Sequence, residues 1–480
     1  MVFPHRRRSG HRKTGERATM LLSFRVENHR SIRDEQQLLL TPVYDDARPQ
    51  EADWEASTVA GIFGANASGK SNLLDALALM RDTVRWSMSD NEPGAGMRRH
   101  AFFLDEESPG EPSAFVIDLK LGGVRYTYGF SIDDDRVVDE WLYGYPQQRK
   151  RIYFERQGEN FTFGDRAQAR LRHIGALTGQ NVLFLTVAAR AGHKAVQPVY
   201  RWFSESLVFA EERRPEPPSW LRGGEASEER LRSLGDLLKS ADTGIRSIEL
   251  QEDGNRTPFR SLRSTGSVGH SLRPDESHRA DRSLFVGAFH GGKTAFLSQL
   301  ADSLSPGSTL LFHHEGTAVE RPLMWEEESL GTRALAVLGF EAQRVLETGG
   351  VLVVDEIDAS LHPYLSARVI ALFQDEGQNP AGAQLIFTSH DAALLGRVRG
   401  EEVLKRDHIW FVDKDEEGRT SLYPLSDFKP RGDDNRARRY LTGRYGAVPE
   451  VDDELFRDAL ARREPRGTTE AVDGKKESAR

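Results

Sequence analysis

The sequence predicts an α/β protein built on a mainly parallel sheet, and three short segments carry this prediction. Residues 59–63, 351–354 and 384–387 are almost entirely apolar. Strands of a parallel sheet are covered on both faces, so they read as continuous apolar runs rather than as alternating ones. The sequence therefore predicts that these three segments lie in one buried sheet.

The first elements along the chain are a hairpin, a strand and a helix. Residues 20–45 alternate apolar and polar side chains, which predicts an antiparallel hairpin with one buried face. Residues 59–63 then form a predicted core strand, and residues 72–80 have the apolar spacing of a helix. A glycine-containing loop separates this strand from this helix.

A β-rich lobe and an insertion come next. Between about 114 and 165, short runs of aromatic and β-branched residues are separated by turn residues, which is typical of an antiparallel meander. Charged helical sequence is predicted from about 182 to 245, and a helical and polar insertion is predicted over about 200–310. Strands resume near residue 310, ahead of the second and third core segments.

The composition indicates a soluble globular protein, whose elaborated domain we place at residues 20–450. The 480 residues include no cysteine, which excludes disulfides and a thiolate nucleophile and is compatible with a cytoplasmic location. No apolar run approaches the roughly 20 residues that span a bilayer, so no membrane partner is expected. The net charge of −9 argues against a protein whose whole surface is basic and binds nucleic acid, although local basic patches are compatible with this charge.

Both ends of the chain are expected to lie outside this domain. The first 19 residues carry six Arg or Lys and one acid, with no apolar segment behind them. They predict a disordered basic extension or a start codon assigned too early. Residues 451–480 predict a disordered C-terminal tail, because the end of the chain has almost no apolar side chains.

Residues 64–71 read Gly-Ala-Asn-Ala-Ser-Gly-Lys-Ser, the pattern of a phosphate-binding loop. Glycines let the backbone N–H groups turn toward a phosphate, and the positive end of the following helix adds to the attraction. A strand before the loop and a helix after it make a chance match the weaker interpretation. The predicted ATP contacts are Gly64, Asn66, Ala67, Ser68, Gly69, Lys70, Ser71 and Asn72. Of these, Lys70 is expected on the β- and γ-phosphates and Ser71 on Mg2+.

Two acids, Asp355 and Glu356, directly follow the apolar segment 351–354. At the end of a buried strand, Asp355 is predicted to hold Mg2+ through water, and Glu356 to orient or deprotonate an attacking water. The alternative is that both are surface acids that open a loop. Their pairing with a phosphate loop favours the chemical interpretation.

A third motif, Ser329-Leu330-Gly331-Thr332, stands shortly before the acidic strand. Residues 333–340 have helical sequence, so Ser329 is a good candidate for an ordinary helix N-cap. A capping role and a ligand-binding role are compatible with each other.

In this order, the motifs resemble those of ABC-type ATPases, in particular the branch with SMC, Rad50, RecF and OLD-family proteins. The resemblance covers roughly residues 20–450 and implies an ABC-type P-loop head with an antiparallel β-lobe and a helical insertion. Members close two copies around two ATP molecules, which implies that Ser329, Gly331 and Thr332 of one copy cap the γ-phosphate bound by the other. It also implies that His390 reads the γ-phosphate, so that Lys70, Glu356 and His390 form the catalytic set.

Two further features of the family are the D-loop and a glutamine that contacts magnesium. Residues 359–363 resemble the D-loop, which passes close to the partner subunit's ATP. The family usually also has a glutamine at the start of the lobe that touches magnesium, but residues 97–130 contain none. No residue is assigned to that role.

Within this branch the chain resembles the RloA/AbiL-type antiphage ATPases of bacteria. It lacks the long coiled coils of SMC and Rad50 proteins and the space for the Toprim domain of OLD nucleases. The resemblance implies a homodimeric ATPase that gates a separately encoded effector, often a nuclease, in antiphage defence. Two other interpretations stay open: a RecF-like DNA-binding clamp with a basic face at residues 149–151 or 256–282, and a scaffold that binds ATP only to assemble.

Overall fold

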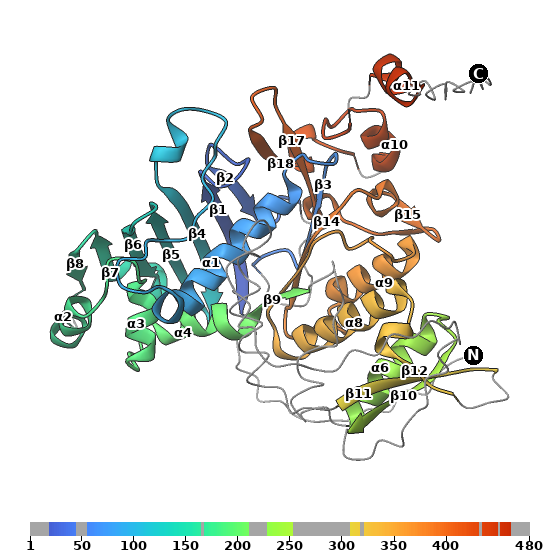
Figure 1. The fold of residues 1–480 in the computed structure, drawn as a ribbon, viewed down its shortest axis with the longest axis horizontal. Coiled ribbons are helices and arrows are strands. Elements are labelled where there is room, and N and C mark those ends of the chain that lie inside the picture. Colours follow the sequence, from blue (N-terminus) through green and yellow to red (C-terminus); the bar gives the residue numbers. More distant parts are fainter. Residues whose placement is uncertain are drawn as a thin grey trace, which may run out of the picture.

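The computed structural model describes residues 19–44, 55–164, 168–210, 228–252, 308–316, 321–431, 434–449 and 452–461 (Figure 1). Three expectations concern residues outside these ranges. They are the basic extension before residue 19, the Arg-rich stretch at 256–282 and the chain end after residue 461. Within the described ranges, no helix has both the length and the apolar character needed to cross a membrane.

The core is a six-stranded, mainly parallel sheet with strand order β18-β17-β3-β14-β13-β9. The strands from β17 to β9 pair in parallel, whereas β18 runs antiparallel to β17. Their bounds are Val59–Phe63 (β3), Leu207–Ala210 (β9), Val351–Val354 (β13), Gln384–Ser389 (β14), Ile409–Lys414 (β17) and Thr420–Pro424 (β18). The three apolar segments therefore lie side by side as β3, β14 and β13, as predicted.

The helices have the following bounds: Lys70–Asp90 (α1), Gln168–Ala176 (α2), Phe184–Arg190 (α3), Gln197–Arg201 (α4), Glu228–Ser240 (α6), Leu330–Thr348 (α8), Pro363–Gln374 (α9), Arg436–Leu441 (α10) and Asp453–Ala461 (α11). The two faces of the core sheet use different helices. Val351, Val353 and Ile386 join a hydrophobic cluster with α1, and Leu352 and Phe387 join a second cluster with α8 and α9. Since neighbouring residues of a strand point to opposite faces, burial on both faces requires apolar residues throughout.

The predicted β-lobe is a seven-stranded antiparallel sheet that includes the N-terminal hairpin, in the order β2-β1-β4-β5-β6-β7-β8. Its strands are Met20–Glu27 (β1), Gln36–Leu39 (β2), Ser113–Leu121 (β4), Val124–Ile132 (β5), Val137–Gly144 (β6), Arg151–Gln157 (β7) and Asn160–Phe163 (β8). Phe115, Tyr128 and Leu142 are buried in the same cluster as α1. The helix that follows the phosphate loop is therefore packed between the lobe and the core sheet (Figure 1).

The insertion differs from the prediction at its start. Residues 207–210 fall in the segment 182–245 predicted to be helical and in the insertion predicted from about 200. They form β9 instead, which pairs in parallel with β13 at the edge of the core sheet. A four-residue apolar run is too short for its periodicity to distinguish a strand from a buried helical turn. Beyond β9, the described residues form α6 on a three-stranded sheet of β10 (Ile245–Glu252), β11 (Ser308–His314) and β12 (Leu323–Met324). The insertion predicted over about 200–310 as helical and polar therefore also contains the strand β10.

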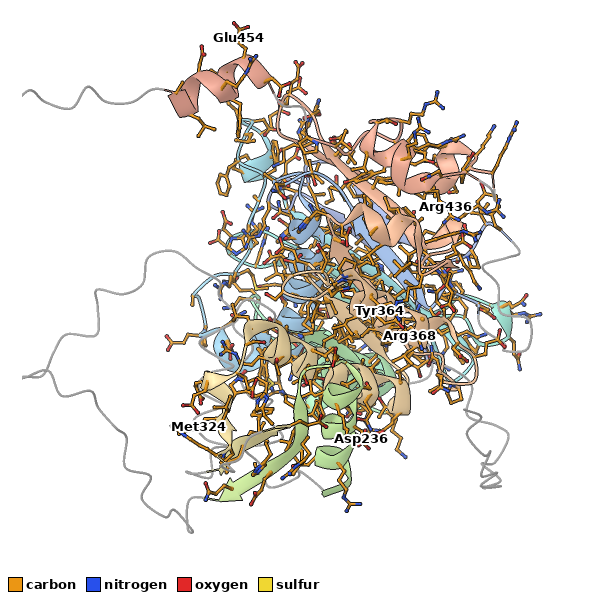
Figure 2. All side chains as sticks on the ribbon, turned by 90° about the vertical axis from the view of Figure 1, so that its right-hand side faces the viewer. Asp236, Met324, Tyr364, Arg368, Arg436 and Glu454 are labelled. Carbon is orange, nitrogen blue, oxygen red and sulfur yellow. The ribbon has the colours of Figure 1, made fainter. Side chains whose placement is uncertain are left out.

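The C-terminal tail also differs from the prediction. Residues 453–461, which were expected to be disordered, form α11. None of its side chains is buried, and Figure 2 shows Glu454 of α11 set apart from the body of the molecule. The prediction of disorder is therefore wrong for residues 453–461, where helix-forming residues such as Glu454, Leu455 and Leu460 favour a short helix.

Candidate nucleotide-binding site

The phosphate loop, residues 64–71, connects β3 to α1 at the carboxyl end of the core sheet. Gly69 caps α1 with φ of 107°, a left-handed conformation that side chains with a Cβ rarely adopt. A Cβ on Gly69 would lie 2.2 Å from Oγ1 of Thr420, and a Cβ on Gly64 would lie 2.4 Å from the carbonyl oxygen of Val412. Both glycines of the motif are therefore required by the loop's shape and by its contact with β17 and the strand beside it.

The Lys70 side chain folds back over the loop. Its Nζ donates hydrogen bonds to the carbonyl oxygens of Gly64 at 2.7 Å and Ala65 at 2.8 Å. Burial lowers the pKa of Lys70, and the carboxylates of Glu356 and Asp355 partly offset this effect. The loop thus presents a cation at the position where a phosphate chain would lie.

Asp355, at the end of β13, is bonded to both neighbouring elements. Its Oδ1 accepts hydrogen bonds from the hydroxyl of Ser71 at 3.1 Å and from the hydroxyl of Thr388 at 2.6 Å. Ser71 and Asp355 therefore stand together as the two predicted metal contacts. Magnesium commonly takes one or two protein oxygens and completes its octahedron with phosphate and water oxygens, so this pair fits that ion.

Glu356 is the next residue, and its backbone is in the left-handed conformation with φ of 56°. The Glu356 N–H donates to Oγ1 of Thr388 at 2.7 Å. The carboxylate is half-buried and accepts no hydrogen bond from any described residue. The backbone of Glu356 is thus held in an unusual conformation while its carboxylate stays available.

His390 directly follows β14, beside the end of β13. Its Nε2 lies 3.3 Å from Oδ2 of Asp358, and the His390 side chain is 56% exposed whereas that of Asp358 is 6% exposed. The other oxygen of Asp358 is buried and has no hydrogen-bond partner among the described residues. The histidine is therefore anchored at one side and open to solvent at the other.

The 329–332 turn begins α8. Ser329 is the N-cap, and its Oγ accepts from the Thr332 N–H at 3.0 Å and lies 2.8 Å from Oγ1 of Thr332. Gly331 packs on the predicted D-loop, since a Cβ there would lie 2.7 Å from the carbonyl oxygen of Ser360. The hydrogen bonds given for this turn stay within its own helix and cap, and Gly331 closely approaches the D-loop. The N-cap interpretation is thus confirmed, and a ligand role remains compatible with it.

Residues 59–396 match the protein family described as "AAA domain, putative AbiEii toxin, Type IV TA system". This match covers more than half of the chain. The protein belongs to this AAA-domain family. No curated protein matches it in sequence.

Several solved structures resemble this AAA-domain protein in fold. An SMC head bound to the C-terminal winged-helix domain of ScpA is 13% identical, with a TM-score of 0.41 over 85% of this chain and 99% of that one. An SMC head domain from Thermotoga maritima is 12% identical, with a TM-score of 0.35 over 84% and 98%. The recombination mediator RecF is 13% identical, with a TM-score of 0.31 over 85% and 99%. The topology itself, a phosphate loop on a mainly parallel sheet flanked by an antiparallel lobe, is the ABC-type head predicted from the sequence.

Thr388, Thr420 and Ser31, which the sequence motifs left without a role, hold the site of this AAA-domain protein together. Thr388 bonds to the carboxylate of Asp355 and to the N–H of Glu356, the two acids that follow β13. Thr420 of β18 donates to the carbonyl oxygen of Ser68 at 2.9 Å and lies 2.7 Å from Oγ of Ser31. Of the three, only Thr388 lies close in sequence to a predicted site residue, since it stands two residues before His390.

Asn72, a predicted nucleotide contact, has a different partner here. Its side chain donates to Oγ of Ser31 at 2.5 Å, so it links the helix to the turn after β1. Asn66 and Ala67 are exposed on the loop, whereas the Ser68 hydroxyl is buried without a partner among the described residues. Of the loop residues predicted to contact ATP, some are therefore exposed and others are buried. Among the described residues, no cluster of three or more His, Asp or Glu side chains forms a separate metal site.

Proposed function

We propose that this protein binds ATP with Mg2+ and hydrolyses it as a homodimer that gates a separately encoded effector in bacterial antiphage defence. The observation that carries the enzymatic part is the convergence of Lys70, Ser71, Asp355 and Glu356 at the end of parallel strands. Cation, hydroxyl, metal-binding carboxylate and free carboxylate are the groups that phosphoryl transfer to water requires.

Each group has a role that its contacts support. Lys70 exchanges its two carbonyl partners for β- and γ-phosphate oxygens when ATP binds. Ser71 and Asp355 hold Mg2+, which offsets the negative charge of the phosphates. Glu356 orients or deprotonates the attacking water, because its carboxylate has no competing hydrogen bond among the described residues. His390 reads the γ-phosphate from its solvent-facing side.

The dimeric part of the proposal concerns the 329–332 turn. The N-terminus of a 19-residue helix attracts anions, and Ser329 and Leu330 are exposed there. The contact of Gly331 with Ser360 ties this turn to the predicted D-loop, so both would approach a second copy together. Ser329, Gly331 and Thr332 of one copy then cap the γ-phosphate held by the other, as the resemblance to ABC-type ATPases implies.

The defence part rests on the resemblance to RloA/AbiL-type ATPases, and the family's description names a toxin of toxin–antitoxin systems. Closure of two copies around ATP is a two-state event, and a partner that binds one state better is released or recruited as ATP turns over. The effector would be a second, separately encoded protein, as the resemblance to RloA/AbiL-type ATPases implies.

The test is steady-state ATP turnover and oligomeric state for wild type, Glu356→Gln and the control Glu347→Gln. Glu347 is exposed on α8, away from the acids of β13. Loss of a general base lowers turnover by about 10²–10⁴-fold. We therefore expect Glu356→Gln to bind ATP, to lose turnover to that extent and to accumulate as a dimer, while Glu347→Gln behaves like wild type.

Three results would redirect the proposal. Unchanged turnover in Glu356→Gln would refute the assigned mechanism. Negligible turnover in wild type, together with ATP-dependent dimers, would indicate the ATP-binding scaffold. Strong stimulation of turnover by linear duplex DNA would favour the RecF-like clamp over a partner-gated ATPase.

A further inference from the structure

The tip of the β6–β7 hairpin carries a cluster of exposed cations that the ATP site does not use. Arg149, Lys150 and Arg151 lie in and beside the turn, and Arg125 lies on the adjacent strand β5. All four side chains are exposed. Residues 141–154 contain no Asp or Glu, in a chain whose net charge is −9. We call these four residues the basic tip.

Tyrosine rings, rather than carboxylates, hold two of these cations, Lys150 and Arg151, in place. Lys150 Nζ lies 3.6 Å from the centroid of the Tyr143 ring, and the Arg151 guanidinium carbon lies 5.2 Å from that of Tyr153. Among the described residues, Arg149, Lys150 and Arg151 form no ion pair. A cation over an aromatic ring is positioned without losing its charge. The charges of Lys150 and Arg151 are therefore fixed in space but not neutralised.

Among the described residues, Asp118 and Glu155 lie near the basic tip; Asp118 is paired with Arg125 of the tip, and Glu155 is bonded to Tyr143. Asp118 accepts from the hydroxyls of Ser23 and Thr127 and lies 3.4 Å from Arg125, whose side chain is still 57% exposed. Glu155 accepts from the Tyr143 hydroxyl at 2.7 Å. Neither removes the positive character of the surface formed by residues 149–151.

The turn itself is built to a defined shape. Gln147 and Gln148 both have left-handed backbones, with φ of 55° and 62°. Consecutive left-handed residues other than glycine are unusual, and such backbone conformations concentrate at binding sites. The Gln148 N–H donates to the carbonyl oxygen of Tyr145 and the Arg149 N–H to that of Pro146, each at 3.2 Å. Arg149 and Lys150 therefore project from a turn closed by its own hydrogen bonds.

The basic tip lies at the opposite end of the lobe from the phosphate loop. Strand pairing places Gly144 and Arg151 at the same end as Lys120 and the start of β1 at Met20. The other end of β1 leads to Ser31, which bonds to the phosphate-loop helix through Asn72. Eight strand residues rise about 25 Å, so substitutions at the tip leave the ATP site untouched.

We propose that the basic tip binds the phosphate backbone of duplex DNA, without sequence preference and without need for ATP. Arginine and lysine side chains contact phosphates, and among the described residues Arg149, Lys150 and Arg151 have no carboxylate partner, while Arg125 stays exposed beside Asp118. A single strand would need ring faces on which bases can stack. Here Lys150 covers Tyr143, Tyr126 stacks on Tyr153, and Arg125 lies over Tyr145, so these rings are already in use. Phosphate contact alone fits a duplex.

The experiment measures the affinity of the full-length protein for a short fluorescein-labelled duplex DNA by anisotropy, without nucleotide, between 50 and 200 mM salt. Each phosphate contact contributes a slope of about 0.9 to the logarithmic salt dependence, so four contacts predict that Kd rises about 150-fold over this range. The triple variant Arg149→Gln, Lys150→Gln, Arg151→Gln retains one contact, and its Kd should rise only about 3–4-fold.

The matched control removes three exposed cations from another surface: Lys429→Gln, Arg438→Gln, Arg444→Gln. It should keep the wild-type affinity and salt dependence, and both triple variants should keep wild-type ATP turnover and melting temperature. The proposal is overturned if the tip variant binds DNA as wild type does, or if the control variant alone loses binding. Weak DNA binding by wild type, with capture of an acidic polypeptide such as polyglutamate at the tip, would instead assign the surface to an acidic protein.

Discussion

Thr388 offers the sharpest test of how this site is assembled. Its side chain is fully buried at the end of β14. The hydroxyl donates to the Asp355 carboxylate at 2.6 Å and accepts the Glu356 N–H at 2.7 Å. One oxygen atom thus orients both the metal-binding acid and the backbone of the proposed base. Thr388→Val keeps the shape of the side chain and removes this oxygen.

The structure sets the expected size of the effect. A hydrogen bond to a charged group contributes about 1.5–3 kcal/mol, and a buried N–H left unpaired costs about 1–3 kcal/mol. Water replaces part of the second loss because Glu356 is half-buried, so the free energy of unfolding should fall by about 2–4 kcal/mol. The left-handed backbone of Glu356 also loses its restraint, and a misplacement of about 1 Å lowers turnover by about 10²-fold.

Urea unfolding and steady-state turnover at saturating Mg-ATP, both at 25 °C, measure the two effects. Thr388→Ser is the control, since it keeps the hydroxyl and loses a methyl group. It should retain turnover within a few-fold of wild type, while Thr388→Val loses about 10²-fold. Turnover of Thr388→Val within twofold of wild type would refute the claim that this hydroxyl positions Glu356.

Three further predictions test other parts of the molecule. Gly69→Ala places a methyl carbon 2.2 Å from the Thr420 hydroxyl, at a residue whose φ of 107° disfavours a Cβ. The affinity for ATP should therefore fall by more than about tenfold, as measured by binding of a fluorescent ATP analogue. His314→Leu removes the side chain whose Nε2 lies 2.6 Å from Glu328, a carboxylate buried just before the 329–332 turn. ATP turnover should fall several-fold, while ATP binding by one subunit stays unchanged. Equal losses of turnover and binding would contradict a link between this pair and the turn. Burial lowers the pKa of His408 to about 3 in the folded protein, whereas its pKa in the unfolded chain is about 6.5. The free energy of unfolding that His408 contributes is therefore present at neutral pH and is lost as pH falls from about 6.5 to 3. Between pH 7 and pH 5, wild type should lose about 2 kcal/mol more stability than His408→Gln in urea titrations, and parallel losses would exclude this histidine as the cause.

Much of the fold could be predicted because its signals are local. The apolar runs of β3, β13 and β14 required burial on both faces, and the alternating segments of the lobe required burial on one. The errors fall where a local pattern is short or weak. Leu207–Ala210 was too brief to be recognised as β9. Asp453–Ala461 does carry apolar residues at helical spacing, Leu455, Phe456 and Leu460, but the polar residues after it led to a prediction of disorder.

In the candidate site, too, the local motifs could be predicted from the sequence, whereas the contacts between distant segments could not. Residues 64–71, Asp355 and Glu356 form motifs with a defined spacing, and the structure places them together. The partners that hold them were not predictable, because Thr420 and Ser31 lie far from the phosphate loop along the chain. Their contact depends on which strands are neighbours, and no periodicity records that.

The sequence by itself determined that this chain has a phosphate loop on a mainly parallel sheet with two acids after a neighbouring strand. Glycine spacing and apolar runs act within a few residues, so they need no tertiary contact to be recognised. Only the tertiary structure decided that the Thr388 hydroxyl joins Asp355 to Glu356 and that Gly331 meets Ser360. It also decided that Lys150 and Arg151 lie over tyrosine rings and far from the phosphate loop. Strand order and register place these groups, and both arise from packing of the whole chain rather than from any local segment.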